Sequence, residues 1–178
     1  MIKILHKFTN EHLYSLKRSS LRDGRDIVTQ SCESLDLSYG VVAQIIFETE
    51  LDESNWTDSV VSNVDFHTSF FWDSNFSNAS FKNVLWHNAS LKNSDFSNAE
   101  LIKVRFLGAD LENCDFSGCL LDEVAFGKNN LGGYSSIKGT DLSNTDLSSC
   151  DFQNVYYNDA TKFPASFKVD EHLGLQKF

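Results

Sequence analysis

The feature that most constrains the fold is a five-residue period in the apolar side chains. Every fifth residue from Leu51 to Leu131 is apolar, and after a one-residue slip at 132–136 the series resumes at Ile137 and runs to Tyr157. An α-helix cannot hold these residues on one face, because a period of five drifts around its 3.6-residue turn. A long flat strand cannot either, since an odd period alternates between the two faces of a sheet.

The positions on either side of each large residue predict how the chain turns. The residue two places earlier is small, with Asn129 the exception, and it shares the inward face because strand neighbours i and i−2 do so. The residue two places later is often Asn or Gly, which tolerate positive φ in tight turns. We therefore expect one bend every five residues. Four bends close a square coil of about 20 residues, and such coils stack at about 4.8 Å. The expected turn residues are Asn at 63, 78, 83, 88, 93, 98, 113, 144 and 154, and Gly at 108, 118, 133 and 139.

The motif small–Asp/Asn–Leu/Phe–Ser–Asn/Gly is clearest at 94–98, 109–113, 114–118 and 140–144. It resembles the pentapeptide-repeat family, and roughly two-thirds of the chain carries the resemblance. The resemblance implies an all-β fold, a right-handed quadrilateral parallel β-helix with short helical caps. The resemblance does not imply one particular function, because proteins with very different functions share repeat scaffolds.

Three segments are expected along the chain: an N-terminal cap, partly helical, at 1–36, the β-helix at 37–157, and a C-terminal cap with a short helix at 158–178. The open edges of a stacked coil must be covered at both ends. Residues 9–18 are expected to form a short helix, and Leu37, Val42 and Phe47 a first coil that is offset from Leu51 by one residue. The tail at 158–167 resembles an ending common in cyanobacterial members of the family, which implies a cyanobacterial source and a closing helix at 170–173.

Charge and composition exclude several classes of protein. The formal net charge is −10, with 15 Lys and Arg against 25 Asp and Glu, whereas binding to nucleic acid or anionic membrane depends on Lys and Arg. No apolar stretch approaches the roughly 20 residues of a membrane-spanning helix, and the N-terminus lacks the apolar core and cleavage site of a signal peptide. We expect a cytoplasmic protein with reduced thiols that binds neither nucleic acid nor membrane.

Histidines and cysteines are the candidates for metal or redox chemistry. His67 and His87 should stack about 5 Å apart on one outer face, where a pair of imidazoles is able to share a metal ion or sense pH. A tight structural zinc site requires about four protein ligands, so the simpler interpretation is that both histidines are solvated surface residues. Cys114, Cys119 and Cys150 fall at inward small positions, where Cys behaves as a small hydrophobe. We predict no metal site, no cofactor site and no catalytic residue.

Acidic residues leave one alternative function open. Some pentapeptide-repeat proteins, the quinolone-resistance type, bind DNA gyrase by resembling acidic duplex DNA, and the net charge is compatible with such a mimic. However, Asp in the second position belongs to the repeat motif itself, and Asn residues precede Asp95 in its column. The outward acids are Asp95, Asp115, Asp141, Asp146 and Asp151.

Phe70 and Trp72 are the candidate protein-contact residues. They flank Phe71 and should point outward. A contiguous exposed apolar patch marks a contact site, and cover by a terminal segment is the simpler alternative. The leading hypothesis is a non-enzymatic scaffold that acts through an unidentified protein partner, with a homodimer as one form of that contact. Further outward apolar residues on two adjoining faces are Leu85, Ile102, Leu107 and Leu120.

Overall fold

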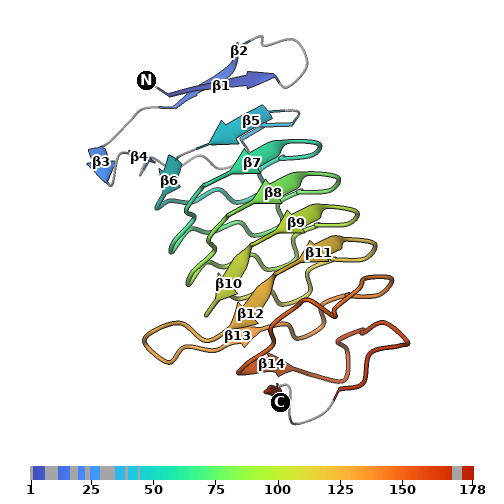
Figure 1. Ribbon diagram of the computed structural model, residues 1–178. Helices are drawn as coiled ribbons and strands as arrows, with labels where there is room; N and C mark the ends of the chain where they lie inside the picture. Colours follow the sequence, from blue (N-terminus) through green and yellow to red (C-terminus); the bar gives the residue numbers. More distant parts are fainter. Residues whose placement is uncertain are drawn as a thin grey trace.

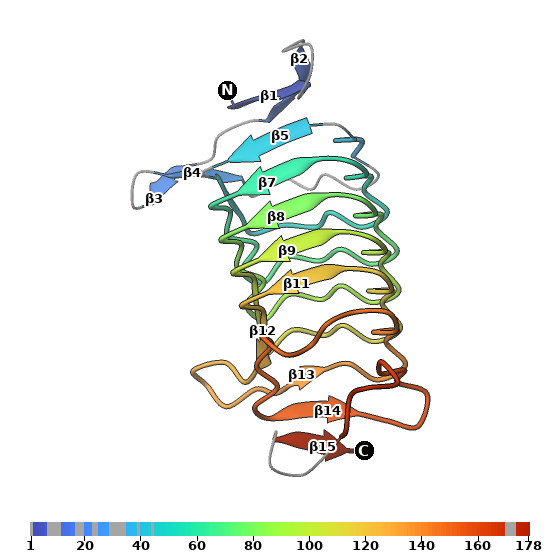
Figure 2. The ribbon, with the colours of Figure 1, turned by 45° about the vertical axis from the view of Figure 1, so that its right-hand side comes forward.

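The computed structural model describes residues 2–6, 12–16, 20–22, 25–28, 35–38, 40–43, 45–169 and 174–178. The described chain winds into a right-handed, four-sided parallel β-helix, as the sequence predicts (Figure 1). Its regular elements are all strands, and the described ranges hold no helix. Figure 2 shows the coils stacked in ladders along the helix axis, with the β1–β2 hairpin at one end and β15 at the other.

The strands of the β-helix are short because each occupies one side of a coil. They are β1 (Ile2–His6), β2 (His12–Leu16), β3 (Ser20–Arg22), β4 (Arg25–Val28), β5 (Gly40–Ala43), β6 (Ile45–Phe47), β7 (Val60–Ser62), β8 (Ser80–Lys82), β9 (Glu100–Ile102), β10 (Arg105–Leu107), β11 (Leu120–Asp122), β12 (Ala125–Gly127), β13 (Ser135–Ser136), β14 (Val155–Tyr157) and β15 (Leu175–Lys177). The largest sheet has the order β11-β9-β8-β7-β5-β1-β2. Its β5, β7, β8, β9 and β11 are parallel, and β1 and β2 join antiparallel at one edge.

Each regular coil advances the chain by 20 residues. Parallel bridges therefore join positions such as Glu50 and Phe70, or Asn55 and Asn75, and backbone hydrogen bonds cross between coils, such as Phe71 N–H to Ser90 C=O at 2.8 Å. We number the four sides of the coil by the buried residue at the centre of each. Face 1 holds Leu51, Phe71, Leu91, Leu111 and Ile137; face 2 holds Trp56, Phe76, Phe96, Phe116 and Leu142; face 3 holds Val61, Phe81, Leu101, Leu121 and Leu147; face 4 holds Phe66, Trp86, Phe106, Phe126 and Phe152.

Left-handed backbone at the predicted turn position makes the corners. All nine predicted Asn residues have positive φ, and so do Gly108, Gly118 and Gly139. Gly133 does not; its neighbour Gly132 has the positive φ instead, at 87°. Residues less suited to this conformation also adopt it where the coil requires a corner, such as Thr68 at 57° and Lys103 at 56°. The coil geometry therefore overrides local preference at those corners.

Aromatic rings stacked from coil to coil fill the axis. On face 4, Phe66 stacks on Trp86 at 5.2 Å between ring centroids, and Trp86 stacks on Phe106 at 5.1 Å. Some hydroxyls at the small inward positions donate to the backbone: Ser74 Oγ to the Leu51 carbonyl at 3.1 Å, and Ser94 Oγ to the Phe71 carbonyl at 2.6 Å. The interior is thus a narrow, close-packed core of the kind that one large and one small residue per repeat can fill.

The first coil has the expected offset. Leu37, Val42 and Phe47 are fully buried, and the bridge from Asp36 to Asn55 is one residue shorter than the regular spacing. The expected helix at 9–18 is wrong for its described part, because His12–Leu16 is strand β2. This hairpin continues the sheet from β5, whose edge would otherwise be open, so the pairing of an exposed sheet edge outweighs the local helical preference.

One insertion interrupts the stack, and it is longer than the sequence predicts. Across it, Ala109 N–H bonds to Ser135 Oγ at a separation of 26 residues, so six residues are added to the regular 20 rather than one. Leu131, expected in the core, is 92% exposed at the loop it belongs to, and Ile137 takes its place on face 1. The β-helix continues beyond the loop, as expected, with Phe152 stacked on Phe126 at 5.1 Å.

The C-terminal segment adds one further strand to the stack. β15 pairs parallel with β14, Val155 opposite Leu175, and Leu175 is buried. Phe167 covers the last coil by packing on Phe152 at 5.7 Å. The expected helix at 170–173 lies outside the described residues.

Candidate protein-contact site

Phe70 and Trp72 stand on face 1, one residue before and one after the buried Phe71. Because successive side chains alternate across a strand, burial of Phe71 directs both neighbours outward, as the sequence predicts. Phe70 is 44% exposed and Trp72 is 46% exposed. We call these two residues the aromatic pair. Their position is confirmed, whereas their role in contact stays a prediction.

The aromatic pair has a fixed geometry. The two rings meet edge to face, with centroids 6.3 Å apart and an interplanar angle of 83°. The Trp72 backbone N–H donates to Asp52 Oδ1 in the coil before, at 2.6 Å, and the indole Nε1 donates to Ser90 Oγ in the coil after, at 2.6 Å. The indole is therefore held along face 1 while its outer surface stays exposed. Because it is already held in place, it loses little further side-chain entropy when a partner binds.

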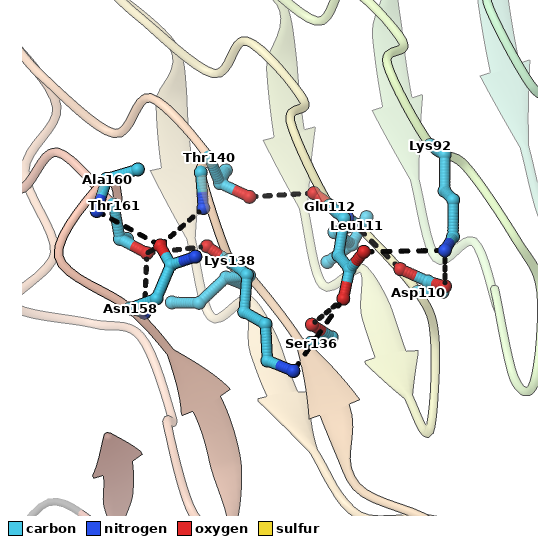
Figure 3. Close-up of polar contacts among 12 residues, drawn as sticks. Lys92, Asp110, Leu111, Glu112, Ser136, Lys138, Thr140, Asn158, Ala160 and Thr161 are labelled. Atoms are coloured by element: carbon cyan, nitrogen blue, oxygen red, sulfur yellow. Dashed lines mark hydrogen bonds and ion pairs between the residues drawn. The ribbon is translucent and has the colours of Figure 1, made fainter. Parts of the chain in front are cut away.

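Charged side chains on face 1 neutralise one another below the aromatic pair. Lys92 Nζ lies 3.0 Å from Asp110 Oδ2 and 3.4 Å from Glu112 Oε2. Figure 3 shows Lys92 turned toward these two carboxylates, with Ser136 and Lys138 on the other side of Glu112. The hydrogen bond to Asp110 is the main reason that the pKa of Lys92 is raised, and burial only partly opposes it. Such surface ion pairs add little stability, but they direct the Lys92 ammonium away from the rings.

The acids of face 2 are part of the turn structure. Asp95, Asp115 and Asp141 stack by parallel bridges. In each, Oδ1 accepts the backbone N–H of the serine two residues later, at 2.7, 2.8 and 2.9 Å. Burial disfavours the Asp141 carboxylate, but hydrogen bonds from Lys162 and Ser143 outweigh it and lower its pKa. Asn75 makes the same turn bond as these acids at 2.9 Å, so the position requires an oxygen acceptor rather than a charge.

The histidine pair lies on face 4, as predicted. The His67 and His87 ring centroids are 6.5 Å apart at an interplanar angle of 79°. Burial lowers the pKa of His87, and the nearby Asp65 carboxylate partly offsets it. Beside the pair is a recess of about 220 Å³, also lined by Leu107 and Leu131. Within the described residues, no group of three or more His, Cys, Asp or Glu side chains is placed to hold a metal ion.

Of the three described cysteines, two are buried and Cys150 is half-buried. Cys114 and Cys119 are buried, as predicted, and each thiol donates to a core carbonyl at 2.9 Å, Cys114 to Leu91 and Cys119 to Phe96. Burial raises the pKa of Cys119 and of Cys150 to about 12, so these thiols are protonated and poorly nucleophilic at neutral pH.

The remaining outward apolar residues divide between two faces, as expected. Leu85 and Leu107 are half-buried on face 4, and Ile102 is half-buried on face 3. Leu120, also on face 3, is 58% exposed. The sequence interpretation missed two exposed residues of face 3, Val41 and Val60. Both stand one residue before a buried position, the same placement that identified Phe70.

Comparison with known families agrees with the fold. Residues 87–118 match the sequence model of the pentapeptide repeats, in 8 copies. This match identifies pentapeptide repeats in the central part of the chain. No curated protein matches it. No helix able to span a membrane occurs in the part of the chain that the structure describes.

Several solved structures are similar. HetL, a pentapeptide repeat protein involved in heterocyst differentiation regulation from the cyanobacterium Nostoc sp. strain PCC 7120, is 14% identical with a TM-score of 0.43, over 83% of this chain and 82% of that one. QnrB1, a plasmid-mediated fluoroquinolone resistance protein, is 14% identical with a TM-score of 0.43, over 82% and 91%. Rfr23 from the cyanobacterium Cyanothece 51142 is 15% identical with a TM-score of 0.33, over 75% and 87%.

Proposed function

We propose that this protein is a non-enzymatic scaffold that binds a protein partner through the aromatic pair on face 1. The observation that supports this most strongly is the exposure of both rings, 44% for Phe70 and 46% for Trp72, together with the hydrogen bonds that hold Trp72 on two sides. Large aromatic side chains are enriched at the energetic centres of protein interfaces. A pre-organised pair loses less entropy on binding than a flexible one.

The chemistry of the remaining surface supports a binding role over the alternatives. The core is filled by stacked aromatic rings, which leaves little room for a substrate cavity along the axis. Bases of the repeat region stand on different faces, such as Lys82 on face 3, Lys92 on face 1 and Arg105 on face 4, so they form no groove that follows a phosphate backbone. A protein partner is the class of ligand that these surfaces suit best.

A DNA mimic directed at gyrase is less well supported. Such a mimic requires a continuous negative face, but the face 2 column begins Asp36, Asn55, Asn75 before it reaches Asp95. At the far end of the column, Lys162 Nζ lies 2.8 Å from Asp141. The stacked acids also use one oxygen each to hold their own turns. Acidity on face 2 is therefore accounted for by the needs of the fold.

The experiment compares Phe70→Ser/Trp72→Ser with a matched control, Leu120→Ser, which removes an exposed apolar side chain from face 3. We expect both proteins to keep the stability of the parent, and only the double variant to lose its captured partners or to change its oligomeric state. A large loss of stability in the double variant, with partners and assembly unchanged, would show that the two rings pack under a terminal segment.

A further inference from the structure

Carboxylates frame the aromatic pair. Glu50 is the parallel bridge partner of Phe70 in the coil before, and its side chain is exposed. Asp73 directly follows Trp72, is also exposed, and accepts a hydrogen bond from Asn93 Nδ2 at 3.1 Å. Glu50 is thus one coil spacing of about 4.8 Å from Phe70, and Asp73 is next to Trp72 in the same coil, so an acid borders each of the two rings.

The other charges of face 1 leave this negative frame in place. The Lys92 ammonium, one coil further on, is turned to Asp110 and Glu112. The face of an aromatic ring is itself the negative part of its quadrupole. The protein as a whole carries a net charge of −10. Rings and carboxylates thus present the same sign of potential to an approaching partner.

We propose that the aromatic pair receives an arginine side chain of a partner protein, an inference that rests on the proposed function of this surface. A guanidinium is planar and weakly hydrated, and it stacks on Trp and Phe while it donates hydrogen bonds to carboxylates. Trp72 and Phe70 supply the ring surfaces, and Glu50 and Asp73 supply the acceptors. Lysine suits the site less well, because its ammonium is compact, strongly hydrated and unable to stack.

The indole of Trp72 gives a direct readout of binding. The chain has three Trp residues, and Trp56 and Trp86 are fully buried, so a quencher or ligand at the surface acts mainly on Trp72. The probe is a blocked tri-arginine peptide, compared with tri-lysine and tri-citrulline peptides of the same length. The titrations are run at about 0.15 M salt, where the Debye length of about 8 Å screens distant charges.

We expect the arginine peptide to change the fluorescence saturably and to bind about fivefold or more tightly than the citrulline peptide, with the lysine peptide between them. Glu50→Gln/Asp73→Asn should weaken arginine binding by about threefold to tenfold, the range expected for the loss of two exposed ion pairs. Both substitutions are near-isosteric, and Asn is well suited to the positive φ of 57° at position 73.

The matched control is Asp122→Asn/Glu123→Gln, which removes the same charge from exposed acids outside face 1. Equal binding of the arginine and citrulline peptides, equal weakening by the two double variants, or no binding of the arginine peptide would overturn the inference. The proposed function is tested separately by Phe70→Ser/Trp72→Ser. If that variant loses its partners while the peptide titrations fail, the contact site stands and its ligand is not arginine.

Discussion

Removal of the Phe96 ring tests the packing of the core most sharply. Its side chain is fully buried, stacked on Phe76 at 4.5 Å and on Phe116 at 4.7 Å, with Trp86 edge-on at 5.5 Å. In Phe96→Ala the cavity cannot close easily, because hydrogen bonds between coils fix their spacing. Truncation of a core aromatic costs about 3–5 kcal/mol. The loss of two stacked neighbours places Phe96 in the upper part of that range.

Urea unfolding followed by circular dichroism measures this effect. With an m value of about 2 kcal/mol/M, a loss of about 4 kcal/mol lowers the midpoint by about 2 M. The matched control is Phe70→Ala, which removes the same ring from a half-exposed position and should cost less than about 1 kcal/mol. A cost under about 1 kcal/mol for Phe96→Ala as well would refute the reasoning, because it would mean that the ring faces solvent.

Four further substitutions probe buried polar and titratable groups. Trp86→Phe and Trp56→Phe both shrink a fully buried ring, but Trp86→Phe should lower the urea midpoint less, because Trp86 Nε1 has no hydrogen-bond partner whereas Trp56 Nε1 donates to Ser54 Oγ at 2.7 Å, a bond worth about 1 kcal/mol; equal effects would contradict this. Burial raises the pKa of Cys119 from 9.0 to about 12, so its contribution to stability is present below pH 9 and lost as the pH rises toward 12. Cys119→Ala should therefore make the midpoint fall less between pH 9 and 11 than in the parent, and an unaltered profile would count against it. Partial burial lowers the pKa of His87 below 6.5, so its contribution to stability is present above that pH and lost on acidification; His87→Gln should reduce the fall in Tm between pH 7.5 and 5, and an identical fall would argue against this effect of burial.

The sequence predicts the β-helix well because a five-residue period has few structural solutions. Phe96 is central and Phe70 exposed for the same reason, since their places in the repeat determine which side of the strand they occupy. Leu131 is the exception, because its place in the repeat predicts burial but its side chain is exposed. An insertion of six residues moves the pattern by only one position, so the period continues through a loop that leaves the core. The adjacent Gly132 and Gly133 are the local signal for such a loop, but they do not encode its length.

Other features depend on contacts between segments that are distant in sequence. The strand at His12–Leu16 forms because it pairs with β1, which covers the edge of β5, and the local propensity of these residues does not indicate that pairing. The aromatic pair is identifiable from its position, whereas the orientation of the Trp72 indole depends on a hydroxyl at Ser90, 18 residues away. The carboxylate frame likewise arises only when Glu50 stacks beside Phe70. Local sequence therefore places the candidate site, and the stacking of coils determines its chemistry.

The central claim is that the aromatic pair touches a protein partner, and photo-crosslinking tests it most directly. A benzophenone amino acid replaces Phe70 in one variant and Leu120, 58% exposed on face 3, in the other. Both proteins are irradiated in the cells that naturally produce the chain, and the adducts are analysed by mass spectrometry. We predict a discrete crosslinked protein from position 70 that is absent from position 120. Adducts within the chain itself, from position 70 to a terminal segment of the same molecule, would contradict the account.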